Sequence, residues 1–221
     1  MPPESIPPTL VPNPTPRQEL LNLVHRLFLF GQRGAPRAVV FTGVGRGTGC
    51  TTVCAGAGAA LDEQVDRDVC IVDGNLRSPL LHQHFGVDNS KGLTDAIARP
   101  GRIRDFARQV RNGKVWLLSS GSIAMPMPVL LSGSKLAERI REIRNEFKYV
   151  IIDAPSVNDY TDAILLGQMS DGVVLVLGSN STRREVARRA KEHIESANVP
   201  VIGAVLNKRE FPIPPFIYER L

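Results

Sequence analysis

The stretch Val39–Cys54, VVFTGVGRGTGCTTVC, decides the fold of this chain. Ala38 to Thr42 is almost wholly apolar and predicts a buried strand, and a helix is expected to begin at Cys50. Between them lie four glycines: Gly43, Gly45, Gly47 and Gly49. Glycines let the backbone curl so that successive N–H groups point at one anion, and a helix N-terminus adds positive potential. The pattern therefore predicts a phosphate-binding loop.

The loop departs from the usual form of this motif, G-x-x-x-x-G-K-[ST], in which the Lys reaches the outer phosphates and the hydroxyl binds Mg²⁺. Gly49 and Thr51 match, but Val44 stands at the first glycine and Cys50 at the lysine. The backbone cradle is thus retained and the lysine charge is lost. The residues expected to contact a nucleotide here are Gly43, Gly45, Arg46, Gly47, Thr48, Gly49, Cys50, Thr51 and Thr52.

Strand and helix patterns alternate along the rest of the chain. Further strands are predicted at Asp68–Asp73, Lys114–Leu118, Tyr149–Asp153, Gly172–Leu177 and Val201–Leu206. Helices are predicted at Arg17–Phe30, Thr51–Glu63, Leu93–Ile97, Arg104–Val110, Lys135–Phe147 and Arg183–Ala197, and a mobile connection at Gly121–Gly133. The fold class is therefore α/β: a doubly wound, mostly parallel sheet like that of P-loop NTPases.

Two aspartates end predicted strands, Asp73 and Asp153. Parallel strands present their carboxyl ends at one edge of the sheet, so we expect both beside the glycine loop. Thr51 is expected to place its hydroxyl on Mg²⁺, with Asp153 acting through water. Asp73 is expected to complete the metal surroundings and to position or deprotonate the attacking hydroxyl. For either carboxylate alone, capping of the next turn is the competing interpretation.

Length and composition favour one folded domain with flanking segments. Residues 1–16 hold seven prolines and predict an extended linker, and residues 17–208 form the domain. Residues 209–221 form a Pro/aromatic segment that is expected either to fold back onto the domain or to dock a partner. The formal charge of +5 suits an anionic ligand or neighbour, although solvated helices account for it equally well. Three cysteines in core elements, no apolar run of about 20 residues and no signal peptide predict a cytoplasmic protein.

The ordered motifs FTGVGRGTGCTT, VCIVDGNLRSPLLHQHFGV, GLTDAI, KYVIIDAPSV and VIGAVLNK make the chain recognisable. From about Arg17 to Lys208 it resembles the cytoplasmic ATPase domain of bacterial tyrosine kinases of capsule and exopolysaccharide synthesis. These belong to a wider group that includes the partition and septum-site ATPases. The resemblance implies ATP and Mg²⁺ as cofactors, with Asp73 and Arg77 retained from a D-x-D-x-R motif. It also implies that Asn207 faces the adenine.

The same resemblance shows what has changed. Besides Cys50, Asn75 replaces a carboxylate, and the C-terminal tyrosine cluster of the kinases is reduced to Tyr218. The oligomerisation motif E-x-x-R-x-x-R survives only as Glu19-x-x-Asn22-x-x-His25, which leaves homo-oligomerisation open. The function expected is therefore a kinase-like protein of exopolysaccharide synthesis or export, binding ATP–Mg weakly and impaired in phosphoryl transfer. Its expected partner is a membrane-anchored polysaccharide co-polymerase or chain-length protein.

Parts of the sequence also fit other functions. A partition or septum-type ATPase on a membrane or DNA is the alternative, but that group has a signature Lys where this chain has Gly45. Arg46 could lower the pKa of the Cys50 thiol or replace the lysine charge. Cys50 and Cys54 lie one helical turn apart, yet the sequence supplies no His or third Cys at finger-type spacing, which disfavours zinc. With Trp116 alone and scattered Phe, no nucleic-acid partner is expected.

Overall fold

The computed structural model describes residues 15–30, 34–111, 114–122, 126, 129–130 and 134–209. The proline-rich linker, apart from its last two residues, and residues 210–221, including Tyr218, lie outside this range. Most of the connection Gly121–Gly133 does too. The predictions made for these segments therefore stay predictions.

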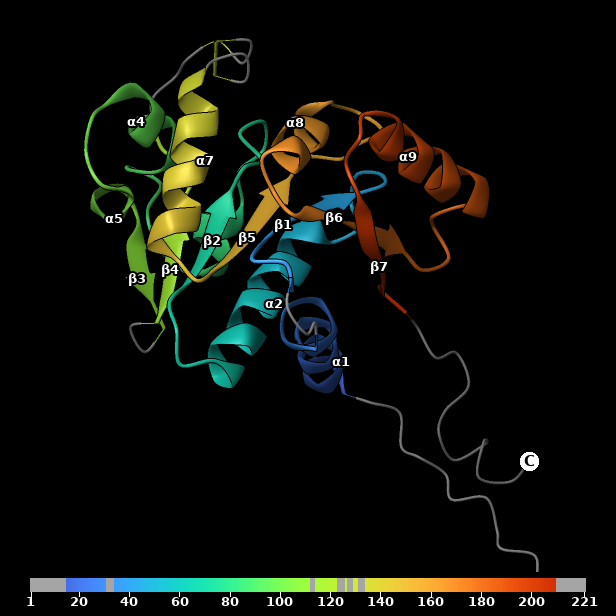
Figure 1. Ribbon diagram of the computed structural model, residues 1–221. Coiled ribbons are helices and arrows are strands. Elements are labelled where there is room, and N and C mark those ends of the chain that lie inside the picture. The colour runs from blue at the N-terminus through green and yellow to red at the C-terminus, as the bar shows by residue number, and fades with distance from the viewer. Residues whose placement is uncertain are drawn as a thin grey trace, which may run out of the picture.

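A seven-stranded sheet forms the centre of the molecule, in the order β3-β4-β2-β5-β1-β6-β7 (Figure 1). Its strands are β1 (Ala38–Gly43), β2 (Val69–Asp73), β3 (Arg108–Val110), β4 (Val115–Leu118), β5 (Tyr149–Ala154), β6 (Gly172–Gly178) and β7 (Val201–Asn207). All neighbouring pairs are parallel except β3 and β4. The predicted α/β class and mostly parallel sheet are confirmed.

Helices cover both faces of the sheet. They are α1 (Pro16–Val24), the π-helix η1 (His25–Leu29), α2 (Cys50–Gln64), α3 (Leu81–His84), α4 (Leu93–Ala98), α5 (Ile103–Phe106), α7 (Ser134–Glu146), α8 (Asp162–Gln168) and α9 (Arg184–Ser196). Thr15 caps α1, where its side chain accepts a hydrogen bond from the backbone N–H of Gln18. Of the helices within the described ranges, none is long and apolar enough to cross a membrane.

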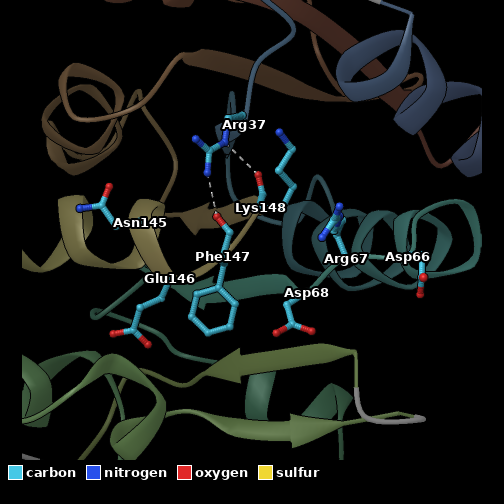
Figure 2. A pocket seen from close by; sticks show the side chains of 8 residues that line it. All are labelled: Arg37, Asp66, Arg67, Asp68, Asn145, Glu146, Phe147 and Lys148. Carbon is cyan, nitrogen blue, oxygen red and sulfur yellow. Dashed lines mark hydrogen bonds between the residues drawn. The ribbon is translucent and has the colours of Figure 1, made fainter.

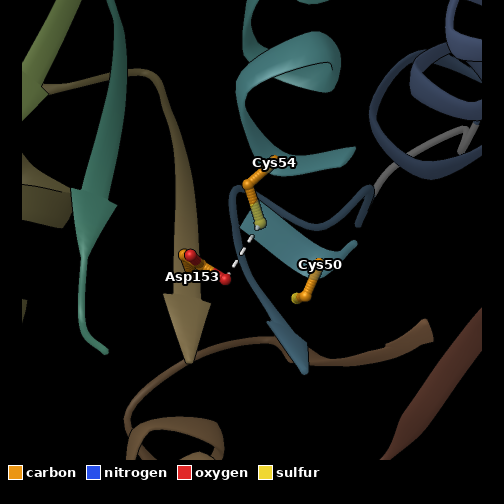
Figure 3. Close-up of side chains that lie close together, drawn as sticks. All are labelled: Cys50, Cys54 and Asp153. Atoms are coloured by element: carbon orange, nitrogen blue, oxygen red, sulfur yellow. Dashed lines mark hydrogen bonds between the residues drawn. The ribbon is translucent and has the colours of Figure 1, made fainter. Parts of the chain in front are cut away.

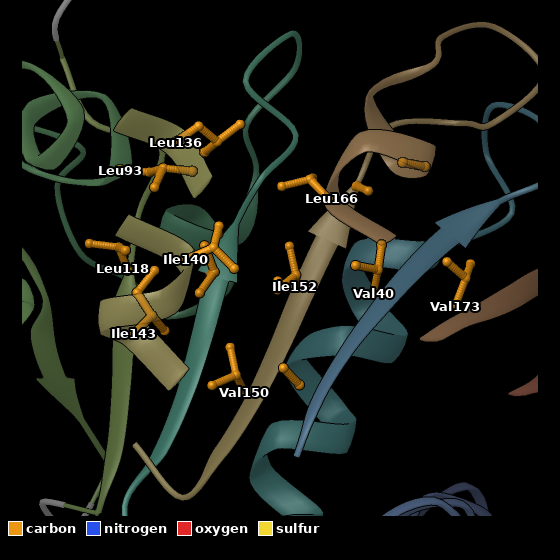
Figure 4. Packing of buried hydrophobic residues seen from close by; sticks show 14 of the residues in the cluster. Val40, Leu93, Leu118, Leu136, Ile140, Ile143, Val150, Ile152, Leu166 and Val173 are labelled. Atoms are coloured by element: carbon orange, nitrogen blue, oxygen red, sulfur yellow. The ribbon is translucent and has the colours of Figure 1, made fainter. Parts of the chain in front are cut away.

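The core has two layers because side chains alternate across each strand. In β1, Val40 packs toward α7 and α8, whereas Val39 and Phe41 pack toward α1 and α2. Figure 4 shows the first layer, where α7 contributes Leu136, Ile140 and Ile143. Since the central strands are buried on both faces, their carboxyl ends are held rigidly, and the site is built on those ends.

One prediction was wrong in part. Arg104–Val110 was expected to be a helix, but only its beginning lies in α5, and Arg108–Val110 forms β3, antiparallel to β4. Three residues at a sheet edge are too few to show a strand period in the sequence, and their pairing with β4 decides the conformation. The structure therefore has seven strands where the sequence indicated six.

Candidate functional site

The glycine loop joins β1 to α2 as predicted. Gly47 and Gly49 have left-handed φ angles of 76° and 81°, which side chains rarely adopt. At Gly43, an added Cβ would collide with the hydroxyl of Thr48. In the described part of the chain, no protein acceptor is bonded to the successive backbone N–H groups from Gly45 to Thr52. The loop thus presents a run of free donors at a helix N-terminus, which suits a phosphate.

The two aspartates converge on this loop. Asp73 and Asp153 are paired residues of the adjacent parallel strands β2 and β5. The Thr51 hydroxyl, from the first turn of α2, donates to Asp153 Oδ2 at 2.6 Å. The structure therefore brings together Thr51, Asp73 and Asp153, the three residues expected to surround a metal. A hydroxyl beside carboxylate oxygens fits a hard cation such as Mg²⁺.

The Asp73 carboxylate is buried, and hydrogen bonds reach one of its two oxygens. Its Oδ2 accepts hydrogen bonds from the backbone N–H groups of Leu80 and Leu81, each at 3.1 Å, while its Oδ1 is buried and has no partner among the described residues. Burial, followed by the charge of Asp153, raises the pKa of the Asp73 carboxyl to about 7. An acid whose pKa lies near neutrality can accept a proton there, as the expected role of Asp73 requires.

Asp153 also contacts a cysteine thiol. Its Oδ1 accepts a hydrogen bond from the Cys54 thiol at 3.7 Å, and burial raises the pKa of the Asp153 carboxyl. A hydrogen bond with Cys54 lowers the pKa of the Cys50 thiol, but burial and the Asp153 carboxylate outweigh it and raise that pKa to about 11. The suggestion of a low-pKa, reactive Cys50 is therefore wrong: this thiol is protonated at neutral pH.

Arg46, which is expected to contact the nucleotide, makes contacts of its own within the protein. Its guanidinium turns to the rim of the site, where it donates to the Tyr160 hydroxyl at 3.2 Å and lies 3.6 Å from Asp159 Oδ2. The side chain is 81% exposed. Screening by water therefore weakens any charge that it could offer to a bound phosphate.

Arg77 is held in the wall of the site. Its guanidinium makes two hydrogen bonds to the buried carboxylate of Asp162, at 2.8 and 3.0 Å, and stacks 4.0 Å from the centre of the Tyr160 ring. The residue replacing the family's second carboxylate, Asn75, accepts a hydrogen bond from the backbone N–H of Ser78. In the motif after β2, Asn75 therefore stabilises its own loop, and Arg77 ties that loop to Asp162.

Asn207, at the end of β7, reaches the loop from the other side. Its side-chain amide donates to the Thr48 carbonyl at 2.8 Å and lies against Gly49. This contact fixes the end of the loop where α2 begins. The adenine contact expected for Asn207 stays a prediction.

A cavity of about 240 Å³ lies over the loop. Its lining includes most of the expected residues (Gly43, Gly45, Arg46, Gly47, Thr48, Cys50, Thr51, Arg77 and Asp153), together with Asn75, Tyr160 and others. Four of the expected residues do not line it: Gly49, Thr52, Asp73 and Asn207. Tyr160 and its neighbour Asp162 were missed from the sequence, because no motif marks them and they reach the site only through the loop after β5.

A larger hollow of about 500 Å³ lies at the opposite edge, where the strands begin (Figure 2). Arg37 lines it and donates to the backbone carbonyls of Lys148 and Phe147, at 3.2 Å each. The guanidinium is therefore already used to close the turn before β5. By its chemistry, the cavity over the glycine loop is the candidate site.

Comparison with known proteins agrees with this geometry. Residues 37–196 match the family described as "Cellulose biosynthesis protein BcsQ". The chain belongs to this BcsQ family. Among curated relatives, the tyrosine-protein kinase YwqD of Bacillus subtilis (strain 168) is 29% identical over 174 residues, 79% of this chain and 73% of the relative. The predicted resemblance to bacterial tyrosine kinases is confirmed.

Solved structures share the fold of this BcsQ-family chain. The chimerical protein CapA2B2 has a TM-score of 0.82 at 26% identity, covering 89% of this chain and 87% of that one. The septum site-determining protein MinD from Pyrococcus horikoshii, complexed with Mg-ADP, has a TM-score of 0.63 at 23% identity, covering 83% and 76%. The second likeness shows the shared fold alone.

Proposed function

We propose that this chain is a nucleotide-binding P-loop protein of exopolysaccharide synthesis or export that binds ATP with Mg²⁺ weakly and has lost most phosphoryl transfer. The proposal rests on a contrast between the backbone N–H groups of the glycine loop and the side chain at the lysine position. The backbone donors from Gly45 to Thr52 have no acceptor among the described residues, whereas Cys50 offers a protonated thiol in place of an ammonium.

The roles of the residues follow from their positions. The loop N–H groups would bind the phosphates, and Thr51 with Asp153 would hold the Mg²⁺. When bound, Mg²⁺ neutralises charge on the phosphate oxygens. Asp73, with a pKa of about 7, would accept the proton of an attacking hydroxyl. Among the described residues, Arg46 and Arg77 are bonded elsewhere, so neither supplies the charge of the missing lysine. Losing one such stabilising contact costs about 10²- to 10³-fold in rate.

Nucleotide binding is tested by thermal unfolding with ATP and Mg²⁺. A ligand at ten times its Kd stabilises the folded state by about 1.4 kcal/mol, so the melting temperature of the wild type should rise by several degrees. Gly45→Val is the matched control. Around Gly45 an added Cβ meets nothing within 4 Å, so valine should block the cavity without straining the loop. Equal shifts in both proteins would show that nucleotide does not bind at the loop.

Catalysis is tested by transfer of labelled phosphate to tyrosine. The wild type should show negligible transfer, and Cys50→Lys should recover part of it. The recovered activity should disappear in the double variant Cys50→Lys/Asp153→Ala. Robust transfer by the wild type that Asp153→Ala abolishes would overturn the proposed loss of catalysis.

The proposed setting is the cytoplasmic face of a membrane, reached through a membrane-anchored polysaccharide co-polymerase or chain-length protein. The setting is the one that the motifs' resemblance to tyrosine kinases of capsule and exopolysaccharide synthesis implies, and relatives named tyrosine-protein kinases support that resemblance. Co-purification of the tagged chain with membranes should require that partner. Nucleotide-dependent dimers that bind membrane or DNA without it would instead favour the partition or septum-type ATPase.

A further inference from the structure

Two thiols and one carboxylate meet below the glycine loop. Cys50 and Cys54 are four residues apart in α2 and so lie on one side of the helix, and Asp153 approaches that side from β5. One ligand atom from each of the three residues lies within 4.8 Å of the others. Figure 3 shows Cys54 and Asp153 pointing toward one another, with the Cys50 sulfur turned to the same side.

We propose that Cys50, Cys54 and Asp153 form a binding site for a thiophilic divalent cation of the Zn²⁺ class. This site takes a softer ion than the Mg²⁺–nucleotide site of the proposed function, with which it shares Asp153. The sequence disfavoured zinc because no third ligand stood at a recognisable spacing. The fold supplies one from a residue 99 positions after Cys54.

The dimensions suit such an ion. Zn–S bonds of about 2.3 Å and Zn–O bonds of about 2.0–2.2 Å place tetrahedral ligand atoms about 3.4–3.8 Å apart. The separation between Cys54 Sγ and Asp153 Oδ1 is 3.7 Å. All three ligand atoms lie within 4.8 Å of one another, which exceeds this spacing by about 1 Å at most. Binding replaces each thiol proton by a metal–sulfur bond, and the two protons leave to the buffer.

The surroundings complete the site. The Thr51 hydroxyl donates to Asp153 Oδ2, which orients the carboxylate and leaves Oδ1 toward sulfur. Such outer contacts commonly fix metal ligands. Cys54 and Asp153 are buried, whereas Cys50 lines the cavity over the loop and gives an ion a path of entry. Three protein ligands leave a fourth position, open to the cavity, for water.

Ligand softness decides which ion is bound. Thiolates favour Zn²⁺ and its neighbours, whereas Mg²⁺ takes oxygen ligands. Asp153 turns one oxygen to each kind of group, Oδ2 to the Thr51 hydroxyl and Oδ1 to the Cys54 thiol. The thiophilic site therefore needs no nucleotide, and its test is independent of nucleotide binding.

The test uses Co²⁺ as a spectroscopic probe on the full chain, purified under reducing conditions without chelator. One equivalent should produce sulfur-to-cobalt charge-transfer absorption in the near ultraviolet and tetrahedral bands in the visible, and Zn²⁺ should abolish both. Cys50→Ser and Cys54→Ser should each remove the charge-transfer band or weaken Co²⁺ binding by about tenfold or more. Thr51→Val should weaken binding by about 10- to 100-fold, as loss of an outer contact does.

Cys70→Ser is the matched control, because Cys70 is a buried free cysteine that packs in the other core layer. It should leave the spectrum unchanged. A second measurement needs no variant: Zn²⁺ should slow alkylation of Cys50 in the wild type, read by mass spectrometry. Absence of the charge-transfer band in reduced wild type, or its loss in Cys70→Ser as in Cys50→Ser, would overturn the proposal.

Discussion

Asp73 offers the sharpest test of the electrostatics of the site. Its carboxyl is fully buried at the end of β2, its Oδ1 has no partner in the part of the chain that the structure describes, and its pKa is raised from 3.8 to about 7. One unit of pKa difference between folded and unfolded states corresponds to about 1.36 kcal/mol. The charged form of Asp73 therefore lowers the free energy of unfolding by about 4 kcal/mol at pH 8.

The sign follows from proton binding. The folded protein holds the Asp73 proton more tightly than the unfolded chain does, so stability from this group is fully present below about pH 4. It is lost as the pH rises from about 4 to about 7, with a slope that approaches about 1.4 kcal/mol per pH unit. Above pH 7 the loss is complete and constant.

Asp73→Asn removes this dependence, because asparagine stays neutral and its carbonyl oxygen can accept the bonds from Leu80 and Leu81. The amide nitrogen then occupies the position without a partner, which costs about 1–3 kcal/mol. The variant should therefore be more stable than the wild type by about 1–3 kcal/mol at pH 8 and about equally stable at pH 5.

Urea unfolding between pH 5 and 8, followed by the fluorescence of Trp116, measures the difference. Asp66→Asn is the control, since that carboxylate is 96% exposed and Lys114 lowers its pKa, so it has finished titrating below this range. If wild type and Asp73→Asn show parallel pH dependence, Asp73 is not the raised acid, and its proposed role as a proton acceptor fails with it.

Three further substitutions can be read by the same urea assay. Arg77→Ala should lower the free energy of unfolding by about 3 kcal/mol, because it leaves Asp162 buried and unpaired. Arg46→Ala at the exposed rim should change it by less than about 0.5 kcal/mol, and equal losses would contradict the role given to Arg77. Gly49→Ala should cost about 1–3 kcal/mol because its φ of 81° is left-handed and its Cβ would meet Asn207, while Gly45→Ala should be tolerated. Arg139→Ala should cost about 2–4 kcal/mol, since the guanidinium binds the carbonyls of Ala96, Arg99 and Gly101; no loss relative to exposed Arg141→Ala would refute this.

The sequence alone determined which strand ends and which loop form the site. Apolar runs of strand length predict buried parallel strands, and strands of one parallel sheet must end at one edge. Asp73 and Asp153 could therefore be expected beside the glycine loop, and they are paired residues of β2 and β5. The loop was equally predictable, because its glycines and Thr51 lie close together in the sequence. The residue types alone indicate which backbone conformations these positions can adopt.

Only the tertiary structure decided how the polar groups are used. Arg77 pairs with Asp162, 85 residues away, and Cys54 meets Asp153, because separate loops and helices close over the same strand ends. The same closure turns Arg46 outward and raises the pKa of Cys50, where proximity in sequence had suggested the opposite. Strand periodicity and turn chemistry depend on neighbours along the chain, whereas burial, charge pairing and ligand geometry depend on residues that only folding brings together.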